Sequence, residues 1–111
     1  MAKGKHLGEL EALVLASVLH IGESANGAAV YRELEVRGSR DPGVAAIHVT
    51  LRRLEQKGYL TSDVGTPSRR GGRPRRWYAP TDLGKRALGA YRRMWASVLS
   101  DLVLPDPETS R

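Results

Sequence analysis

The stretch DPGVAAIHVTLRRLEQKGYL, residues 41–60, carries the strongest fold signal in this sequence. Four of its apolar residues are spaced by three, four and three positions, which places them on one face of an α-helix. They are Val44, Ile47, Leu51 and Leu54. Asp41 before Pro42 is a helix start signal, because aspartate accepts N–H groups of the first turn and proline has no N–H to satisfy there. Gly58 ends the pattern, so we expect a core helix from Asp41 to this glycine.

Two further helices are expected before the core helix. Apolar residues recur at helical spacing between Gly8 and His20. After a turn at residues 22–26, the pattern resumes around Val30 and ends near Gly38. Three short helices therefore precede residue 59.

After the core helix the pattern changes to a period of two. Tyr59–Thr66 and Arg75–Ala79 are predicted to form two strands, with Gly71-Gly72 as the turn between them. Five arginines fall within residues 69–76, so the hairpin is strongly basic. Neighbouring cations repel one another in a free loop, whereas they suit a hairpin that follows DNA phosphates or a narrow minor groove.

A fourth helix begins at Thr81 and Asp82, and we expect it to run to about Leu104, because Pro105 and Pro107 cannot continue it. Its apolar residues cover an arc of roughly 160°, which is more than a small three-helix core can bury. Exposed apolar patches of this extent usually mark interfaces, so we predict a homodimer. The expected dimer contacts are Leu10, Val14, Leu88, Tyr91, Met94, Trp95, Val98, Leu99 and Leu102.

The composition fits one folded domain. With 111 residues, of which 41% are hydrophobic and 27% charged, the chain is long enough for one core and too apolar to be disordered. The absence of cysteine excludes disulfides, thiol nucleophiles, thiolate zinc sites and iron–sulfur clusters. The net charge of +6 is concentrated in residues 52–93, which carry 12 basic and 3 acidic side chains. Such a basic stripe is typical of a protein that binds a polyanion, and nucleic acid is the leading class.

The side of the core helix opposite its apolar stripe is the surface available to a nucleic acid. Small side chains in its first turns would let the backbone approach a groove, while alanine and valine contact thymine methyls without hydrogen bonds. Arg52 and Arg53 lie beyond the helix start, so phosphate contact fits them at least as well as guanine recognition. A solvated helix face is the alternative for these charges, and the basic hairpin argues against it. The predicted contacts are Gly43, Ala45, Ala46, His48, Val49, Thr50, Arg52, Arg53, Arg69, Arg70, Arg73 and Arg75.

Four sequence stretches carry a resemblance to a known family. They are LGELE (7–11), AIH to LRRLE (46–55), KGYL (57–60) and GGR to WYAPT (71–81). In this order they resemble the PadR-like family of bacterial transcriptional regulators, from about Leu7 to Val98. The resemblance implies an α+β winged helix-turn-helix fold of three helices plus a two-stranded wing over residues 1–80. A C-terminal dimerisation helix over 81–104 and a flexible tail over 105–111 would follow.

The resemblance also implies a homodimeric repressor whose third helix enters the major groove and whose wing touches the backbone or minor groove. The family commonly has tyrosine where this chain has His48, and tyrosine-glycine where it has Asn26-Gly27. Both positions often approach DNA in the family, so Asn26 joins the predicted contacts. Trp95 resembles a tryptophan with which some short members stack flat aromatic compounds. It is therefore a candidate ligand-binding residue for a small aromatic effector, although packing in the dimer core is the favoured interpretation.

These observations predict a sequence-specific, DNA-binding repressor that recognises an inverted repeat in duplex DNA. A basic RNA-binding or ribosome-associated module is the alternative, and an acid–base hydrolase is a distant third. No enzyme, cofactor or metal site is expected, because His6, His20 and His48 are scattered along the chain. No apolar run is long enough to span a bilayer, and Glu9 and Glu11 interrupt the pattern of a signal peptide. We expect a cytoplasmic, nucleoid-associated protein.

Overall fold

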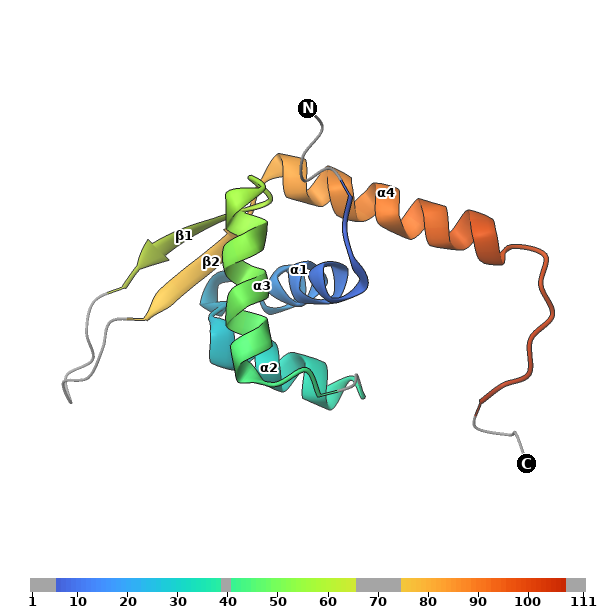
Figure 1. The fold of residues 1–111 in the computed structure, drawn as a ribbon, viewed down its shortest axis with the longest axis horizontal. Coiled ribbons are helices and arrows are strands. Elements are labelled where there is room, and N and C mark those ends of the chain that lie inside the picture. Colours follow the sequence, from blue (N-terminus) through green and yellow to red (C-terminus); the bar gives the residue numbers. More distant parts are fainter. Residues whose placement is uncertain (1–5, 39–40, 66–74, 108–111) are drawn as a thin grey trace.

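The computed structural model describes residues 6–38, 41–65 and 75–107. In chain order, the elements are α1 (Glu9–Ile21), a 3-10 turn (Gly22–Ser24), α2 (Gly27–Val36), α3 (Val44–Gln56), β1 (Leu60–Val64), β2 (Arg76–Pro80) and α4 (Asp82–Leu99). This order confirms the predicted winged helix-turn-helix fold with an additional C-terminal helix (Figure 1). The wing formed by β1 and β2 lies on the opposite side of the molecule from the far end of α4. The expected turn at Gly71-Gly72 lies outside the described residues.

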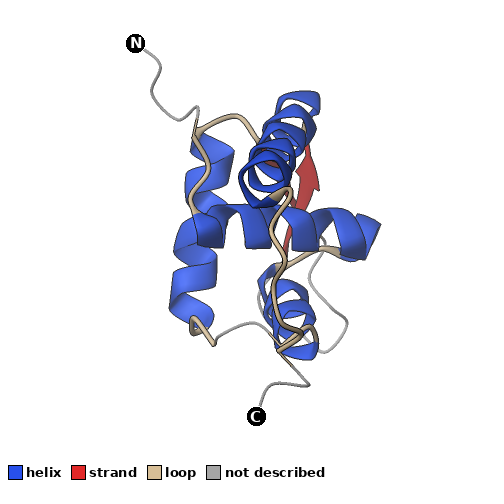
Figure 2. Ribbon diagram, turned by 90° about the vertical axis from the view of Figure 1, so that its right-hand side faces the viewer, coloured by secondary structure: helices blue, strands red, loops and turns tan. Residues whose placement is uncertain are grey.

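The first three helices cross one another around a single hydrophobic core (Figure 2). The core residues are Val14, Leu15, Val18, Ala25, Val30, Leu34, Ile47, Leu51, Leu54, Tyr59, Leu60 and Tyr78. Because α3 buries Ile47, Leu51 and Leu54 on one side, its opposite side faces outward. Val14 is fully buried in this core and has no accessible surface, so the prediction that it contacts a second subunit is wrong.

The start of α3 differs from the expectation. The helix begins at Val44, because Gly43 has a φ of 85° and interrupts the helical backbone. Asp41 makes a local turn instead of capping the helix: its Oδ1 accepts a hydrogen bond from the Gly43 N–H at 2.9 Å. Val44, expected on the core face, therefore lies at the edge of the first turn with 51% of its surface exposed. The helix ends before Gly58, as predicted, where φ is 83°.

The wing is a two-stranded antiparallel sheet in which Leu60 pairs with Pro80 and Val64 with Arg76. The side chains alternate between its two faces, so that Tyr78 is buried and Trp77 is only half-buried. Tyr78 is therefore the aromatic residue of this pair that faces the core. The backbone N–H of Tyr78 donates to the Ala25 carbonyl at 2.9 Å, which joins the sheet to the segment before α2.

The fourth helix is anchored at its first turn and is exposed at its far end. Thr81 caps it as predicted, because its Oγ1 accepts from the Gly84 N–H at 2.9 Å and donates to the Gly58 carbonyl at 2.7 Å. Gly84 packs so closely on the Tyr59 carbonyl that a Cβ at this position would overlap it. The helix ends at Leu99 rather than near Leu104, because Ser100 leaves the helical conformation and Asp101 adopts a φ of 66°.

Candidate nucleic-acid interface

The outward side of α3 carries most of the residues predicted to contact DNA. Ala45, His48, Val49, Arg52 and Arg53 are exposed. Gly43 and Ala46, which lie at the start of the helix, are half-buried. Thr50, which was also predicted to contact DNA, is only 4% exposed, and its hydroxyl donates to the Ala46 carbonyl at 2.7 Å. Thr50 is therefore turned toward the core side and away from the exposed face.

A basic recess opens beside this face, between α2, α3 and β2, with a volume of about 440 Å³. The residues that line it are Asn26, Gly27, Ala28, Arg32, His48, Arg52, Arg75, Arg76 and Tyr78. Four of these carry a guanidinium group, and none is a carboxylate. A concave surface with this charge is suited to an anionic group such as a phosphate, because the positive potential of several nearby arginines adds up there.

The N-terminus of α2 forms one wall of the recess. Asn26 is 8% exposed, and its Oδ1 accepts from the Ala29 N–H at 2.8 Å, so it caps the helix. Asn26 thus has a structural role as a helix cap and also lines the recess, and its contact with DNA stays a prediction. Gly27 follows, and the His48 imidazole lies directly against it: a Cβ on Gly27 would overlap the ring at Cε1.

The wing forms another wall of the recess and is tied to α3 by a chain of hydrogen bonds. Arg76 Nη1 donates to the Ser62 Oγ at 2.9 Å, and the Ser62 hydroxyl donates to Glu55 Oε2 at 2.7 Å. Burial raises the pKa of the Tyr78 phenol, and the nearby Glu55 raises it further, so Tyr78 is uncharged at neutral pH. The wing is thus held against α3 at its base while Arg75 remains exposed.

Two of the recess arginines, Arg32 and Arg76, were not predicted from the sequence. Arg32 belongs to α2, and it reaches the recess only because α2 and α3 pack together, which no spacing in the sequence reveals. Arg76 belonged to the basic run, although it was not chosen as a contact. Of the predicted wing contacts, Arg75 lines the recess, whereas Arg69, Arg70 and Arg73 lie outside the described residues.

A second exposed surface is apolar and lies on the far half of α4. Ala87 and Leu88 pack against the core, whereas Met94, Trp95, Val98 and Leu99 are exposed. The rings of Tyr91 and Trp95 lie 6.0 Å apart between centroids, with a tilt of 49°. Leu102 is also exposed, beyond the end of the helix.

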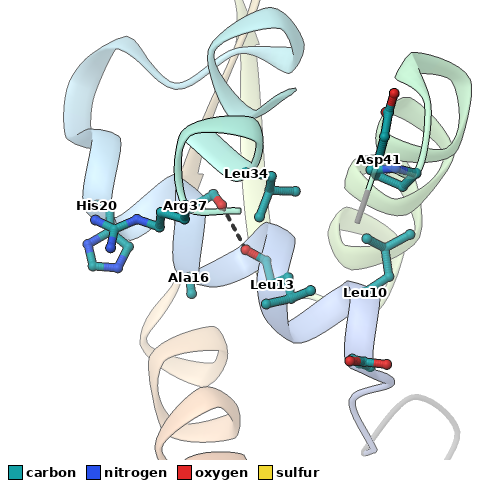
Figure 3. Close-up of a pocket in the computed structure, with 10 residues that line it drawn as sticks. Leu10, Leu13, Ala16, His20, Leu34, Arg37 and Asp41 are labelled. Carbon is teal, nitrogen blue, oxygen red and sulfur yellow. Dashed lines mark hydrogen bonds between the residues drawn. The ribbon is translucent and has the colours of Figure 1, made fainter. Parts of the chain in front are cut away.

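An apolar groove of about 670 Å³ runs along the exposed side of α1 (Figure 3). Leu10, Leu13 and Ala16 of α1 and Leu34 of α2 line it, with His20, Arg37 and Asp41 at its margins. Leu10 is thus half-buried rather than fully exposed, in a hollow that a side chain from another molecule could fill.

Other kinds of site are not found in the part of the chain that the structure describes. No group of three or more His, Asp or Glu side chains is placed to hold a metal ion among these residues. No single described helix has the length and apolar character of a membrane span; α1 and α2 pass that test only when taken together, and they are bent by 118° relative to each other.

The fold and the basic face define a winged helix-turn-helix protein, and comparison with known proteins gives its family. Residues 15–90 match the transcriptional regulator PadR-like family. A PadR family transcriptional regulator from Eggerthella lenta is 30% identical, with a TM-score of 0.65 over 81% of this chain and 79% of that one. The chain therefore belongs to the PadR-like family of transcriptional regulators, as its motifs predicted. It is a family of regulators, not of enzymes.

More distant structures share the fold. A PadR family regulator from Clostridium difficile is 21% identical, with a TM-score of 0.68 over 82% of this chain and 91% of that one. The PadR protein of Bacillus subtilis in complex with operator DNA is 20% identical, with a TM-score of 0.64 over 92% of this chain. The match covers 52% of that larger protein. No curated protein matched the sequence.

Proposed function

We propose that this PadR-family regulator is a dimeric repressor that binds an inverted repeat in duplex DNA through α3, the basic recess and the wing. The observation that supports it best is the exposed α3 face that continues into a recess lined by four arginines without a carboxylate. The Bacillus subtilis relative was solved with operator DNA, which is consistent with this use of the fold. We place its action in the cytoplasm, at the nucleoid.

Different residues of the proposed DNA-binding surface make different kinds of contact. Ala45, Ala46 and Val49 offer methyl groups for close approach to a groove, whereas Arg52 and Arg53 supply the charge. The recess and the wing arginines hold phosphates, which position the protein without specifying sequence. Sequence preference therefore depends on few side chains. We leave Thr50 out of the interface because of its burial.

Dimerisation is proposed to use the far half of α4 and the groove along α1. Met94, Val98 and Leu99 form an exposed apolar surface that the fold of one chain leaves uncovered, and the groove beside Leu10 offers a matching hollow. A two-fold pair would place two α3 helices on one side of a duplex, with half-sites about 34–36 Å apart or a multiple of that spacing. In domain terms, residues 1–80 bind DNA, 81–104 pair the subunits and 105–111 form a tail.

Footprinting on the DNA that flanks its own gene tests the proposal. A protected inverted repeat, with half-sites one or more helical turns apart, is the expected result. Specific retention of RNA but not of this DNA would instead support the alternative of an RNA-binding or ribosome-associated module. A protected site without two-fold symmetry would contradict the dimer while leaving DNA binding in place.

A further inference from the structure

We propose that a pocket of about 530 Å³ between the wing, the end of α1 and the start of α4 binds an apolar amine, and that the bound amine strengthens DNA binding. By an apolar amine we mean a small molecule with one ammonium group on a hydrocarbon body. The effect on DNA rests on the proposed function, whereas the binding of the amine does not. Of the described residues, Tyr78 alone lines both this pocket and the basic recess, so the two are separate hollows.

The walls of the pocket are mainly apolar, and its volume lies within the usual range of ligand sites, roughly 300–1,000 Å³. The apolar wall residues are Val18, Leu19, Trp77, Ala79 and Pro80. They come from α1 and β2, which meet because the bond from the Tyr78 N–H to the Ala25 carbonyl holds β2 beside the end of α1. Leu19 is 38% exposed and Trp77 is half-buried. A hydrocarbon body in the pocket would therefore cover apolar surface that is now in contact with water.

The indole of Trp77 lies next to a carboxylate. It is positioned by Gly65, where a Cβ would overlap the indole Nε1. Asp63 is the partner of Trp77 in the register of the sheet. Side chains of directly opposed residues stand on the same face of a sheet, with Cβ atoms about 4.5–5.5 Å apart. An ammonium group placed here is attracted by both neighbours, through a cation–π contact with the ring and an ion pair with the carboxylate.

The charge around the pocket favours a cation over an anion. Two carboxylates, those of Glu23 and Asp63, line it together with one ammonium group, that of Lys85. This local excess of negative charge contrasts with the net charge of +6 of the whole chain. The side chain of Asp63 makes no hydrogen bond or ion pair with any other residue that the structure describes. It is therefore available to a ligand.

Strand β2 connects the pocket to the basic recess. Trp77 and Ala79 line the pocket, Arg75 and Arg76 line the recess, and Tyr78 lines both. An amine binds the arrangement of β2 in which the pocket is formed, and in this same arrangement the two arginines already stand in the recess. A ligand that favours this arrangement therefore also favours DNA binding, and DNA should raise the affinity for the amine by the same factor.

Nuclear magnetic resonance tests the pocket without DNA. The chain has two tryptophans, so ¹⁵N-labelled protein gives two indole N–H signals, which Trp95→Phe assigns. The probe is 2-cyclohexylethylamine, which is charged at neutral pH, as lysine is. Its controls are 2-cyclohexylethanol, which has the same body without the charge, and 3-cyclohexylpropionate, which has the opposite charge. The signal of Trp77 should shift while that of Trp95 stays in place. The amine should bind about fivefold more tightly than the alcohol, the upper end for an exposed charge pair, and the acid most weakly.

A pair of variants tests the role of the carboxylate. Asp63→Asn removes the charge with little change in size, so it should lose most of the preference for the amine while its affinity for the alcohol stays the same. Glu35→Gln is the matched control, because it removes an exposed carboxylate of α2 outside the pocket, and it should behave as the parent does. Equal affinity of the parent for amine and alcohol, or a preference that persists in Asp63→Asn, overturns the assignment of the ligand. A Trp77 signal that no probe shifts overturns the pocket as a site.

The effect on DNA is measured with a fluorescent duplex of random sequence, which suffices because phosphate contacts do not depend on sequence. Ethylamine at the same concentration is the control, since it matches the ionic strength but lacks the hydrocarbon body. The probe should lower the dissociation constant about fivefold, the lower end of usual coupling between two sites, and by less in Asp63→Asn. An unchanged or higher dissociation constant overturns the coupling. Absence of DNA binding with and without the probe, while the Trp77 signal still shifts, overturns the proposed function and the coupling but not the amine site.

Discussion

The outward faces of α3 and α4 differ in a way that separates two kinds of partner. Both helices are amphipathic. One side of α3 faces the core along the length of the helix, whereas α4 is buried only near its beginning. On α3, Ile47, Leu51 and Leu54 are fully buried, and the charged side chains of the exposed face, Arg52 and Arg53, are both basic. On α4 the relation is reversed in the far half, where Val98 is 69% exposed and Leu99 is 43% exposed.

This contrast indicates that the α4 surface is suited to another protein surface and that the basic face of α3 is suited to a polyanion. Leaving large apolar side chains in water forfeits roughly 25 cal/mol for each Å² of apolar surface that could be buried, so the α4 surface gains stability from another apolar surface. Arginines gain nothing from such burial, but they gain from phosphates by counterion release. Removal of charge from the α3 face or the recess should therefore weaken DNA binding without changing self-association.

The strongest response to mutation should be the loss of self-association in Leu99→Asp. A carboxylate in the proposed α4 contact would have to be buried without a partner, which costs more than the contact supplies. Sedimentation should show monomer, and DNA binding should weaken because two half-sites are no longer held together. Ala96→Asp is the matched control, since Ala96 is exposed on the polar side of the same helix and should remain associated. A Leu99→Asp protein that sediments and binds like the parent would refute this role of α4.

The second response is electrostatic and belongs to the recess. Replacing Arg52 and Arg75 with alanine should flatten the slope of log K against log salt by about 1.8, roughly 0.9 for each phosphate that is no longer neutralised. Cognate and random duplexes should bind more weakly to the same extent, while sedimentation stays unchanged. A weakening confined to the cognate sequence would contradict phosphate contact and would favour base recognition by these arginines.

A third prediction compares a buried charge with these exposed ones. Glu11 of α1 is nearly buried, and both its carboxylate oxygens accept from Lys57 Nζ, at 2.9 and 2.8 Å. Burial by itself raises the pKa of Glu11, but the hydrogen bonds from Lys57 and from the Gly8 N–H outweigh it, so the pKa is lowered. We expect Glu11→Gln to lower the free energy of unfolding by about 1–3 kcal/mol at neutral pH, because Lys57 then loses a charged partner.

The sign of the pH dependence follows from that lowered pKa. The stabilisation by Glu11 is complete above the ordinary carboxyl pKa of about 4.3 and is lost as the pH falls through the lower pKa of the folded state. Denaturant unfolding from neutral to acid pH should show this loss in the parent and in the exposed control Glu23→Gln, but not in Glu11→Gln. An equal acid sensitivity in Glu11→Gln would show that other carboxylates cause it.

The smallest expected effect is a change in the fluorescence of Trp95. If two α4 helices pair near this residue, their indoles can stack on a flat aromatic compound, which would make it an effector acting on the spacing of the two α3 helices. Fluorescence of the parent should then be quenched by planar dyes, and Trp95→Ala should abolish that quenching. Quenching that persists in Trp95→Ala would come from Trp77, and Trp95 would be a packing residue.

The elements themselves could be predicted from the sequence, whereas several side-chain roles could not. Helical spacing and the capping residues placed α1 to α4 within a few residues, because these signals act over one or two turns. The signals failed at Gly43, whose φ of 85° delays α3, and at Ser100, where the helix ends before the prolines require it. In both places, the local backbone conformation ended the pattern that side-chain periodicity alone would continue.

The exposed face of α3 was predictable, but the recess beside it was not. Periodicity showed which side of α3 lies outward, since it depends only on the position of Ile47, Leu51 and Leu54. It could not show that Thr50 bonds back to the backbone or that Asn26 is used as a cap. It also could not show that Val14 is fully buried in the core and so cannot contact a second subunit.

The amino-acid sequence was sufficient for the family, the order of helices and wing, and the concentration of positive charge between residues 52 and 93. Spacing, capping and composition are local properties, and each can be read along one stretch of chain. The packed structure was needed to show which distant residues meet: Arg32 with Arg76 in one recess, and His48 against Gly27. The reason is that burial of one common core fixes the angles between helices, and those angles bring together side chains that no periodicity connects.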